Sequence, residues 1–248
     1  MHTDDVILEN AELLRRFPKR RPSLPDSYAH VYTALRDSDR PVRFFVPLQL
    51  ERWLHTQAAR EKHSFPLLEL GAGALNHVPY EEAHGDYDIV EPFTALYRER
   101  RERSRVRRIF SDISDIPIEA QYQRIISIAV LEHVLDLPTM IARCALLVRD
   151  RGVFCAGIPS EGEFLWHLAS RFGTGIVFRW RFGVSYTPFI RREHINTADE
   201  IVRAVKIFFA DVHLRRFPFS LHHLSLYTMI TARKPQREIA TAYLHRVP

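Results

Sequence analysis

Residues that could bind a ligand or catalyse a reaction stand at four points of this chain where apolar segments end. They are the turn Glu69-Leu-Gly-Ala-Gly73, the acids Glu91 and Asp112, and the tripeptide Leu131-Glu-His133. Glycines permit positive φ angles and let a ligand approach the backbone closely, and a carboxylate can accept two hydrogen bonds from a vicinal diol. If the apolar segments are parallel strands, their ends meet at the carboxyl edge of one sheet, where such sheets bind ligands. The pattern therefore predicts a site for a nucleotide-like ligand.

A Gly-x-Gly turn after a strand serves either the pyrophosphate of a dinucleotide or the methionine part of S-adenosylmethionine. A dinucleotide site favours a third glycine that opens a long helix, but Asn76 stands in that place and Pro79 follows closely. The Glu69 carboxylate would repel phosphates and attract an ammonium. These residues favour the methyl donor over a nicotinamide cofactor, and a purely structural turn is a further alternative.

The acids at the next two strand ends have expected roles in such a site. Glu91 follows Gly71 by about 20 residues, the spacing of a ribose-binding acid in both cofactor classes. The alternative is an ordinary surface glutamate. Asp112 is placed to accept from an adenine amino group, with Ile113 against the ring, although Asp-x-x-Asp is also a natural turn sequence.

Apolar runs that alternate with helical patterns predict an α/β fold with a mostly parallel sheet. We expect strands at Leu67 to Leu70, Tyr87 to Val90, Arg107 to Phe110, Arg124 to Ala129, Gly152 to Ile158, Val212 to Arg216 and Leu224 to Ala232. We expect helices near 78–84, 93–104 and 138–149. A capping box at Thr197-Ala-Asp-Glu200 predicts the start of a helix that reaches about Phe209.

Two segments lie outside this alternation. Residues 1–64 are broken by prolines and predict a helical cap, with its best helix at Glu51 to Arg60, which covers either the pocket or an edge of the sheet. Residues 160–196 are too many for a plain connection. They interleave aromatic residues with arginines, which predicts a substrate lid for an anionic acceptor. We therefore expect a cap segment, 1–64, and a domain, 65–248, that carries the lid.

A family resemblance rests on the four places above and on the strand from Gly152 to Pro159. Over residues 65–232 the chain resembles a class I S-adenosylmethionine-dependent methyltransferase, of the bacterial type with Leu-Glu-His after the fourth strand. The resemblance implies a Rossmann-like seven-stranded sheet with helices on both faces, an antiparallel last strand and S-adenosyl-L-methionine as cofactor. It implies cofactor contacts from Gly71, Gly73, Glu91, Asp112, Ile113, Ala129 and Val130. Glu69, Ala72, Asn76 and Pro92 stand beside these residues and are further candidate contacts. Asn76 departs from the family pattern of small residues.

Methyl transfer from a sulfonium is an in-line displacement, so alignment of the two reactants supplies much of the catalysis. A base is needed only for a poor nucleophile. His133 is the first candidate base because imidazole titrates near neutral pH, and His194 and Tyr186 are the others. Since the chain has 13 histidines, a structural role is the alternative for each histidine. The expected acceptor is a small or glycan-like, anionic molecule.

The composition bounds the class of protein. Apolar residues make up 46% of the chain and charged residues 26%, as is usual for a soluble globular protein. Cys144 and Cys155 stand in apolar surroundings, so we expect no disulfide framework and no metal site. The chain shows no signal peptide and no apolar run of membrane-spanning length. A cytoplasmic location is expected.

The net charge of +5 permits anionic partners. The arginine-rich run from Arg98 to Arg108 is expected to be a solvated helix face, because Glu and Arg stand three and four residues apart. Nucleic acid is therefore not the expected partner, and RNA methylation is the alternative function. A cofactor-binding scaffold without catalysis is a second alternative. The sequence gives no oligomeric state.

Overall fold

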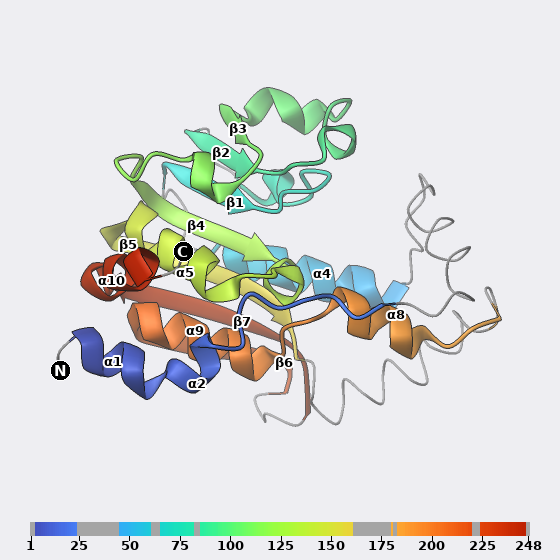
Figure 1. Ribbon diagram of the computed structural model, residues 1–248. Coiled ribbons are helices and arrows are strands. Elements are labelled where there is room, and N and C mark those ends of the chain that lie inside the picture. The colour runs from blue at the N-terminus through green and yellow to red at the C-terminus, as the bar shows by residue number, and fades with distance from the viewer. Residues whose placement is uncertain are drawn as a thin grey trace.

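The structure is a computed structural model, and it describes residues 3–23, 45–60, 65–81, 85–160, 180, 183–219 and 224–246 (Figure 1). The side chains of residues 45–50, 186 and 189 lie outside the description. Among the described helices, none combines the length and apolarity needed to cross a bilayer.

One seven-stranded sheet organises the chain, with strand order β3-β2-β1-β4-β5-β7-β6. The strands are β1 (Leu67–Leu70), β2 (Tyr87–Val90), β3 (Arg108–Phe110), β4 (Tyr122–Ile128), β5 (Val148–Pro159), β6 (Phe209–Pro218) and β7 (Ser225–Pro235). β7 is antiparallel to β5 and β6, and the pairs among β1 to β5 are parallel. The predicted sheet is confirmed. Chain order reverses between β1 and β4, the switch point at which such sheets bind ligands.

The central strands are short because their apolar runs are short, and they are buried on both faces. All four residues of β1 and of β2 are buried. Leu68 and Leu70 belong to one apolar core, and Leu67 belongs to a second core on the opposite face. This alternation follows from the two-residue period of a strand. It aims Glu69, which is in phase with Leu67, at the second face.

Helices cover both faces, as predicted. The α-helices are α1 (Thr3–Glu9), α2 (Ala11–Leu14), α4 (Phe45–Ala58), α5 (Leu137–Leu147), α8 (Tyr186–Glu193), α9 (Ala198–Phe208) and α10 (Arg237–Arg246). The 3-10 turns are η2 (Val78–Tyr80), η3 (Thr94–Leu96), η4 (Arg101–Arg105), η5 (Ile113–Asp115) and η6 (Leu131–His133). Helix α5 packs between α9 and α10, whereas α4 packs against β4, β5 and β7. Figure 1 shows α1 and α2 beside α9 and α10.

Three helix predictions need correction. Within the described part of 78–84, only the short turn η2 is helical, and Pro79 is its second residue. Residues 93–104 form the turns η3 and η4 instead of one helix, because Tyr97 is the sole buried side chain in that stretch and no apolar stripe holds a full helix. The third helix ends at Leu147, and β5 starts at once.

The capping box is confirmed, whereas the final helix was missed. Thr197 Oγ1 accepts from the Glu200 N–H, and a Glu200 carboxylate oxygen accepts from the Thr197 N–H. Helix α10 follows β7 and buries Ile239, Ala240 and Tyr243. Cys144 and Cys155 are buried, and neither forms a disulfide.

The N-terminal segment does not lie over the glycine turn with its first helices. α1 packs against α10. Among the described residues of this segment, Lys19 reaches the loop after β4, where its N–H donates to the Leu135 carbonyl (2.8 Å), and α4 reaches the glycine loop, where Glu51 accepts from Asn76 (3.3 Å). The proposed lid falls largely outside the described residues, since 161–179 are not described. The proposed division at residue 65 stays a prediction.

Candidate functional site

The turn after β1 contains two glycines, and each position favours glycine for a different physical reason. Both have positive φ, +62° at Gly71 and +51° at Gly73, where a side chain is strained. A Cβ on Gly71 would lie 2.4 Å from Val130 Cγ2, so this glycine lets β1 and the end of β4 pack together. A Cβ on Gly73 would meet no described atom within 4 Å. Gly71 therefore serves packing, while Gly73 presents bare backbone to open space.

Glu91 joins the ends of β1 and β2. One of its carboxylate oxygens accepts from the Gly73 N–H (2.8 Å) and the other from the Phe93 N–H (2.9 Å). The residue is buried, with 6% of its surface exposed. Each oxygen keeps a second lone pair, so both can still accept from a diol. The neighbouring Pro92 is exposed.

Asp112 and Ile113 follow β3 in the turn η5. Asp112 Oδ1 accepts from the Ser114 N–H (2.8 Å) and hydroxyl (2.6 Å), and Asp115 completes a capping box. The hydrogen bonds from Ser114 hold the pKa of Asp112 below its usual value. Ile113 is 3% exposed and packs in the core. The turn role of Asp-x-x-Asp is thus present, and the adenine contacts stay a prediction.

The end of β4 turns sharply at Ala129. Its φ is +55°, and its N–H donates to the Gly157 carbonyl (2.8 Å). Ala129 is exposed and Val130 half-buried, with the Val130 side chain directly against Gly71. Val130 therefore packs against the glycine turn, and Ala129 beside it is open to solvent.

The side chains of Glu69 and Asn76 have hydrogen-bond partners away from the open backbone at Gly73. Glu69 is 3% exposed and accepts from the Tyr87 hydroxyl (2.7 Å). Burial raises the pKa of Glu69 to about 8, against the lowering effect of the Tyr87 hydrogen bond. Asn76 is exposed and donates to Glu51 of α4 (3.3 Å). Ala72, between the two glycines, is buried.

His77 belongs to a buried network of polar side chains that was not predicted from the sequence. His77 Nδ1 lies 3.1 Å from His55 Nδ1, and its Nε2 lies 2.7 Å from a Glu81 oxygen. The other Glu81 oxygen accepts from Arg124 (2.5 Å), which is fully buried on β4. Burial lowers the pKa of His77 to about 4. The network ties the glycine loop to α4 and β4, and no sequence spacing signals it.

The tripeptide Leu131-Glu-His133 lies against the residues that follow α8. His133 Nδ1 donates to the Glu193 carbonyl (2.8 Å), and the His133 and His194 rings meet edge to face with centroids 4.7 Å apart. Burial lowers the pKa of His133, and it lowers the pKa of His194 to about 3. Glu132 is 2% exposed, and burial raises its pKa to about 8. The Tyr186 side chain lies outside the described residues.

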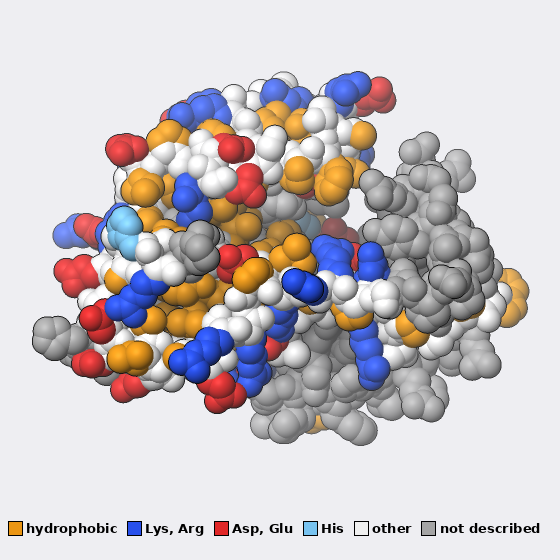
Figure 2. Space-filling view, viewed as in Figure 1, with side chains coloured by type: hydrophobic (Ala, Val, Ile, Leu, Met, Phe, Trp, Pro, Cys, Tyr) orange, Lys and Arg blue, Asp and Glu red, His pale blue; other side chains and the backbone are white. Residues whose placement is uncertain are grey.

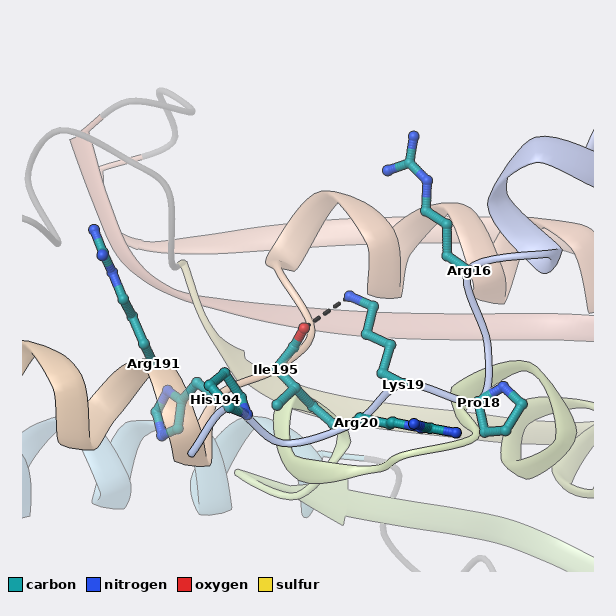
Figure 3. Close-up of a pocket in the computed structure, with 8 residues that line it drawn as sticks. Arg16, Pro18, Lys19, Arg20, Arg191, His194 and Ile195 are labelled. Carbon is teal, nitrogen blue, oxygen red and sulfur yellow. Dashed lines mark hydrogen bonds between the residues drawn. The ribbon is translucent and has the colours of Figure 1, made fainter. Parts of the chain in front are cut away.

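A basic pocket of about 420 Å³ lies beside His194. Its lining is Arg16, Pro18, Lys19, Arg20, Pro22, Arg191, His194 and Ile195. Figure 3 shows the Lys19 ammonium donating to the Ile195 carbonyl (2.7 Å), with Arg191 pointing away. Figure 2 shows Lys and Arg side chains along the 17–23 segment and beside α8. The positive charge favours an anionic ligand.

The arginine run has mostly intramolecular partners. Arg105 donates to the Val78 and Glu81 carbonyls, and Arg107 makes a two-point hydrogen bond with Asp88 (2.9 and 2.7 Å). These arginines support η2 and β2. The geometry therefore gives RNA binding no added support.

Comparisons with known proteins give a fold. No family model matches the chain, and no curated protein matches it. The N-methyltransferase NodS from Bradyrhizobium japonicum WM9, solved with S-adenosyl-L-homocysteine, is 16% identical, with 86% of this chain and 100% of that one covered and a TM-score of 0.56. A Thermotoga maritima S-adenosylmethionine-dependent methyltransferase, a possible histamine N-methyltransferase, is 13% identical (84% and 96% covered, TM-score 0.55).

A carbon methyltransferase, CurJ, is similar as well, at 14% identity (94% of this chain and 70% of that one covered, TM-score 0.52). Identities this low establish shape and leave chemistry open. The chain has the Rossmann-like fold of S-adenosylmethionine-dependent methyltransferases.

Proposed function

We propose that the chain is an S-adenosylmethionine-dependent methyltransferase that acts on a small or glycan-like, anionic acceptor. The observation that carries the proposal is the open backbone at Gly73, tied to the Glu91 carboxylate at the switch point of the sheet. A ligand with an amino-acid end and a ribose would fit that pair, because bare backbone and a carboxylate with lone pairs left to accept from a diol stand side by side.

The remaining roles follow from position. Gly71, Ala72 and Gly73 would border the methionine part, with Asn76 at the outer end of the loop. Glu69 is buried against Tyr87 and holds a proton below about pH 8, so it would border the glycine loop without supplying the charge expected to balance the ammonium. Glu91 with Pro92 would border the ribose. Asp112 and Ile113 would hold the adenine, while Ala129 and Val130 would close the pocket. The cofactor supplies an electrophilic methyl group when it is bound.

The acceptor is proposed to bind on the side of the basic pocket. Arg20 and Arg191 border that pocket and are exposed, so they can pair with a phosphate or carboxylate. Alignment of the acceptor with the methyl group would supply most of the rate. His133, His194 and Tyr186 remain the candidate groups for handling a proton.

Mass spectrometry of an acceptor panel tests the activity. The protein is incubated with S-adenosylmethionine and with matched anionic and neutral acceptors, such as sugar phosphates and their parent sugars. The proposal expects one added methyl on an anionic member. The Glu91→Ala variant should lose that product. Cofactor binding with no product across the panel would favour the scaffold alternative, and methylation of neutral members alone would overturn the anionic preference.

A further inference from the structure

Three potential metal ligands meet at the end of β4, although they come from distant parts of the chain. Glu132 and His133 belong to η6, and His194 follows α8. One ligand atom from each lies within 4.8 Å of the others. The Ile195 and Asn196 N–H groups both donate to the Glu132 carbonyl (2.9 and 3.1 Å), which clamps the two segments together.

The clamp also holds the neighbouring carbonyls. Asn196 Nδ2 donates to the carbonyls of Leu131 (2.8 Å) and Val134 (2.7 Å). The loop around His133 is therefore fixed at both ends by one buried side chain. Such fixation is what a preorganised site requires, because ligands must be held before the ion arrives.

The orientation of His133 is set by its backbone partner. Its Nδ1 faces the Glu193 carbonyl at 2.8 Å, and a carbonyl can only accept, so Nδ1 carries the proton in the neutral ring. The lone pair then lies on Nε2, which is 3.9 Å from Glu132 Oε1. Metal-binding histidines usually donate their other ring N–H to a carbonyl or carboxylate in this way.

Glu132 gives an independent sign that a cation belongs here. Its side chain is 2% exposed, and its Oε2 accepts no hydrogen bond from any described residue. A buried carboxylate oxygen without a donor is costly, because it has lost water and gained nothing in return. A cation held between the carboxylate and the two imidazoles would remove that cost.

We propose that Glu132, His133 and His194 bind one divalent transition-metal ion. Two imidazoles with one carboxylate favour Zn²⁺, Fe²⁺ or Co²⁺ over Mg²⁺ and Ca²⁺, which prefer oxygen ligands. Three protein ligands leave a coordination position for another molecule, as in catalytic zinc sites. The ligand atoms, which lie within 4.8 Å of one another, must approach each other on binding, since two ligands at about 2.1 Å from one ion lie at most about 4.2 Å apart.

The place of the site connects it with the proposed function, on which this step rests. Leu131–His133 directly follows Ala129 and Val130, so the open coordination position would lie beside the methyl group. It would receive an acceptor oxygen and lower that oxygen's pKa. The hydroxyl proton would pass to solvent, the oxygen would form the new bond to the methyl carbon, and the carbon–sulfur bond would break to release S-adenosylhomocysteine.

Metal titration of the chelator-treated protein tests the site. Zn²⁺ binding is measured by calorimetry and Co²⁺ binding by visible absorption. We expect one tight equivalent, weakened at least about tenfold in Glu132→Gln and in His194→Gln. His213→Gln is the matched control, because His213 is an exposed histidine that also faces an acid, Asp211 (2.9 Å). It should bind the metals as the parent does.

S-adenosylhomocysteine binding by each variant checks the fold and separates the two proposals. Binding of this ligand without a tight metal equivalent would overturn the metal site alone. A tight metal equivalent without binding of this ligand would overturn the proposed function alone. A metal affinity equal in the parent, Glu132→Gln and His194→Gln would also overturn the site.

Discussion

Gly71 packs so closely against Val130 that a Cβ on the glycine would lie 2.4 Å from Val130 Cγ2. The contact joins the end of β1 to the loop after β4, the two strands between which the chain order reverses. The left-handed φ of Gly71 and this contact both demand a glycine. The open position two residues later, Gly73, is thus held in place by a packed one.

A double-mutant cycle tests that contact. Gly71→Ala should destabilise the protein by about 2–4 kcal/mol, because the left-handed φ and the clash with Val130 both oppose a methyl group. Adding Val130→Ala should restore part of the loss, since it removes the clash and leaves the φ penalty. Urea denaturation of the four proteins measures the coupling. Additivity within about 0.5 kcal/mol would contradict the contact.

Stability should depend on pH through Glu69. Its pKa of about 8 in the folded protein exceeds the ordinary 4.5. Between those values the folded chain holds a proton that the unfolded chain has released, so the free energy of unfolding falls as pH rises. Urea denaturation at pH 5.5 and 7.5 should show a smaller fall for Glu69→Gln, which keeps the acceptor for Tyr87. An equal fall in both proteins would refute the assignment.

The buried ion pair between Arg124 and Glu81 should be essential for folding stability. Arg124→Met leaves Glu81 with a buried charge and should cost about 3–5 kcal/mol. Arg101→Met is the matched control, because Arg101 pairs with Glu102 at the surface. Its stability should hardly change. Equal urea midpoints for the two variants would show that the buried pair does not stabilise the fold.

The strands were predictable because their apolar runs are bounded by chemically distinct residues. Leu67–Leu70 and Tyr87–Val90 have the predicted bounds. The helices predicted after β1 and β2 do not form, because charge spacing does not say whether a segment has an apolar face to bury. The 3-10 turns form there instead.

The sequence could predict that these residues gather at the carboxyl edge of the sheet, because parallel strands end together. It could not predict their hydrogen-bond partners. Glu69 faces Tyr87, and His133 faces Glu193, 60 residues further along the chain. Tertiary packing sets such pairs, and one sequence carries no signal for them. The expectation of no metal site rested on cysteine content and local spacing, whereas the ligands that we propose come from distant segments of the chain.

Calorimetry of S-adenosylmethionine binding tests whether the glycine turn after β1 holds the cofactor. Gly73→Leu should weaken binding at least about tenfold, because the side chain would occupy the open space against the ligand. Gly183→Leu is the matched control, since Gly183 also has a positive φ (+71°) and, among the described atoms, none lies within 4 Å of where its Cβ would be. We predict that the parent and Gly183→Leu bind S-adenosylmethionine with the same affinity and that Gly73→Leu binds it more weakly. No binding by the parent, or equal binding by all three, would contradict the account.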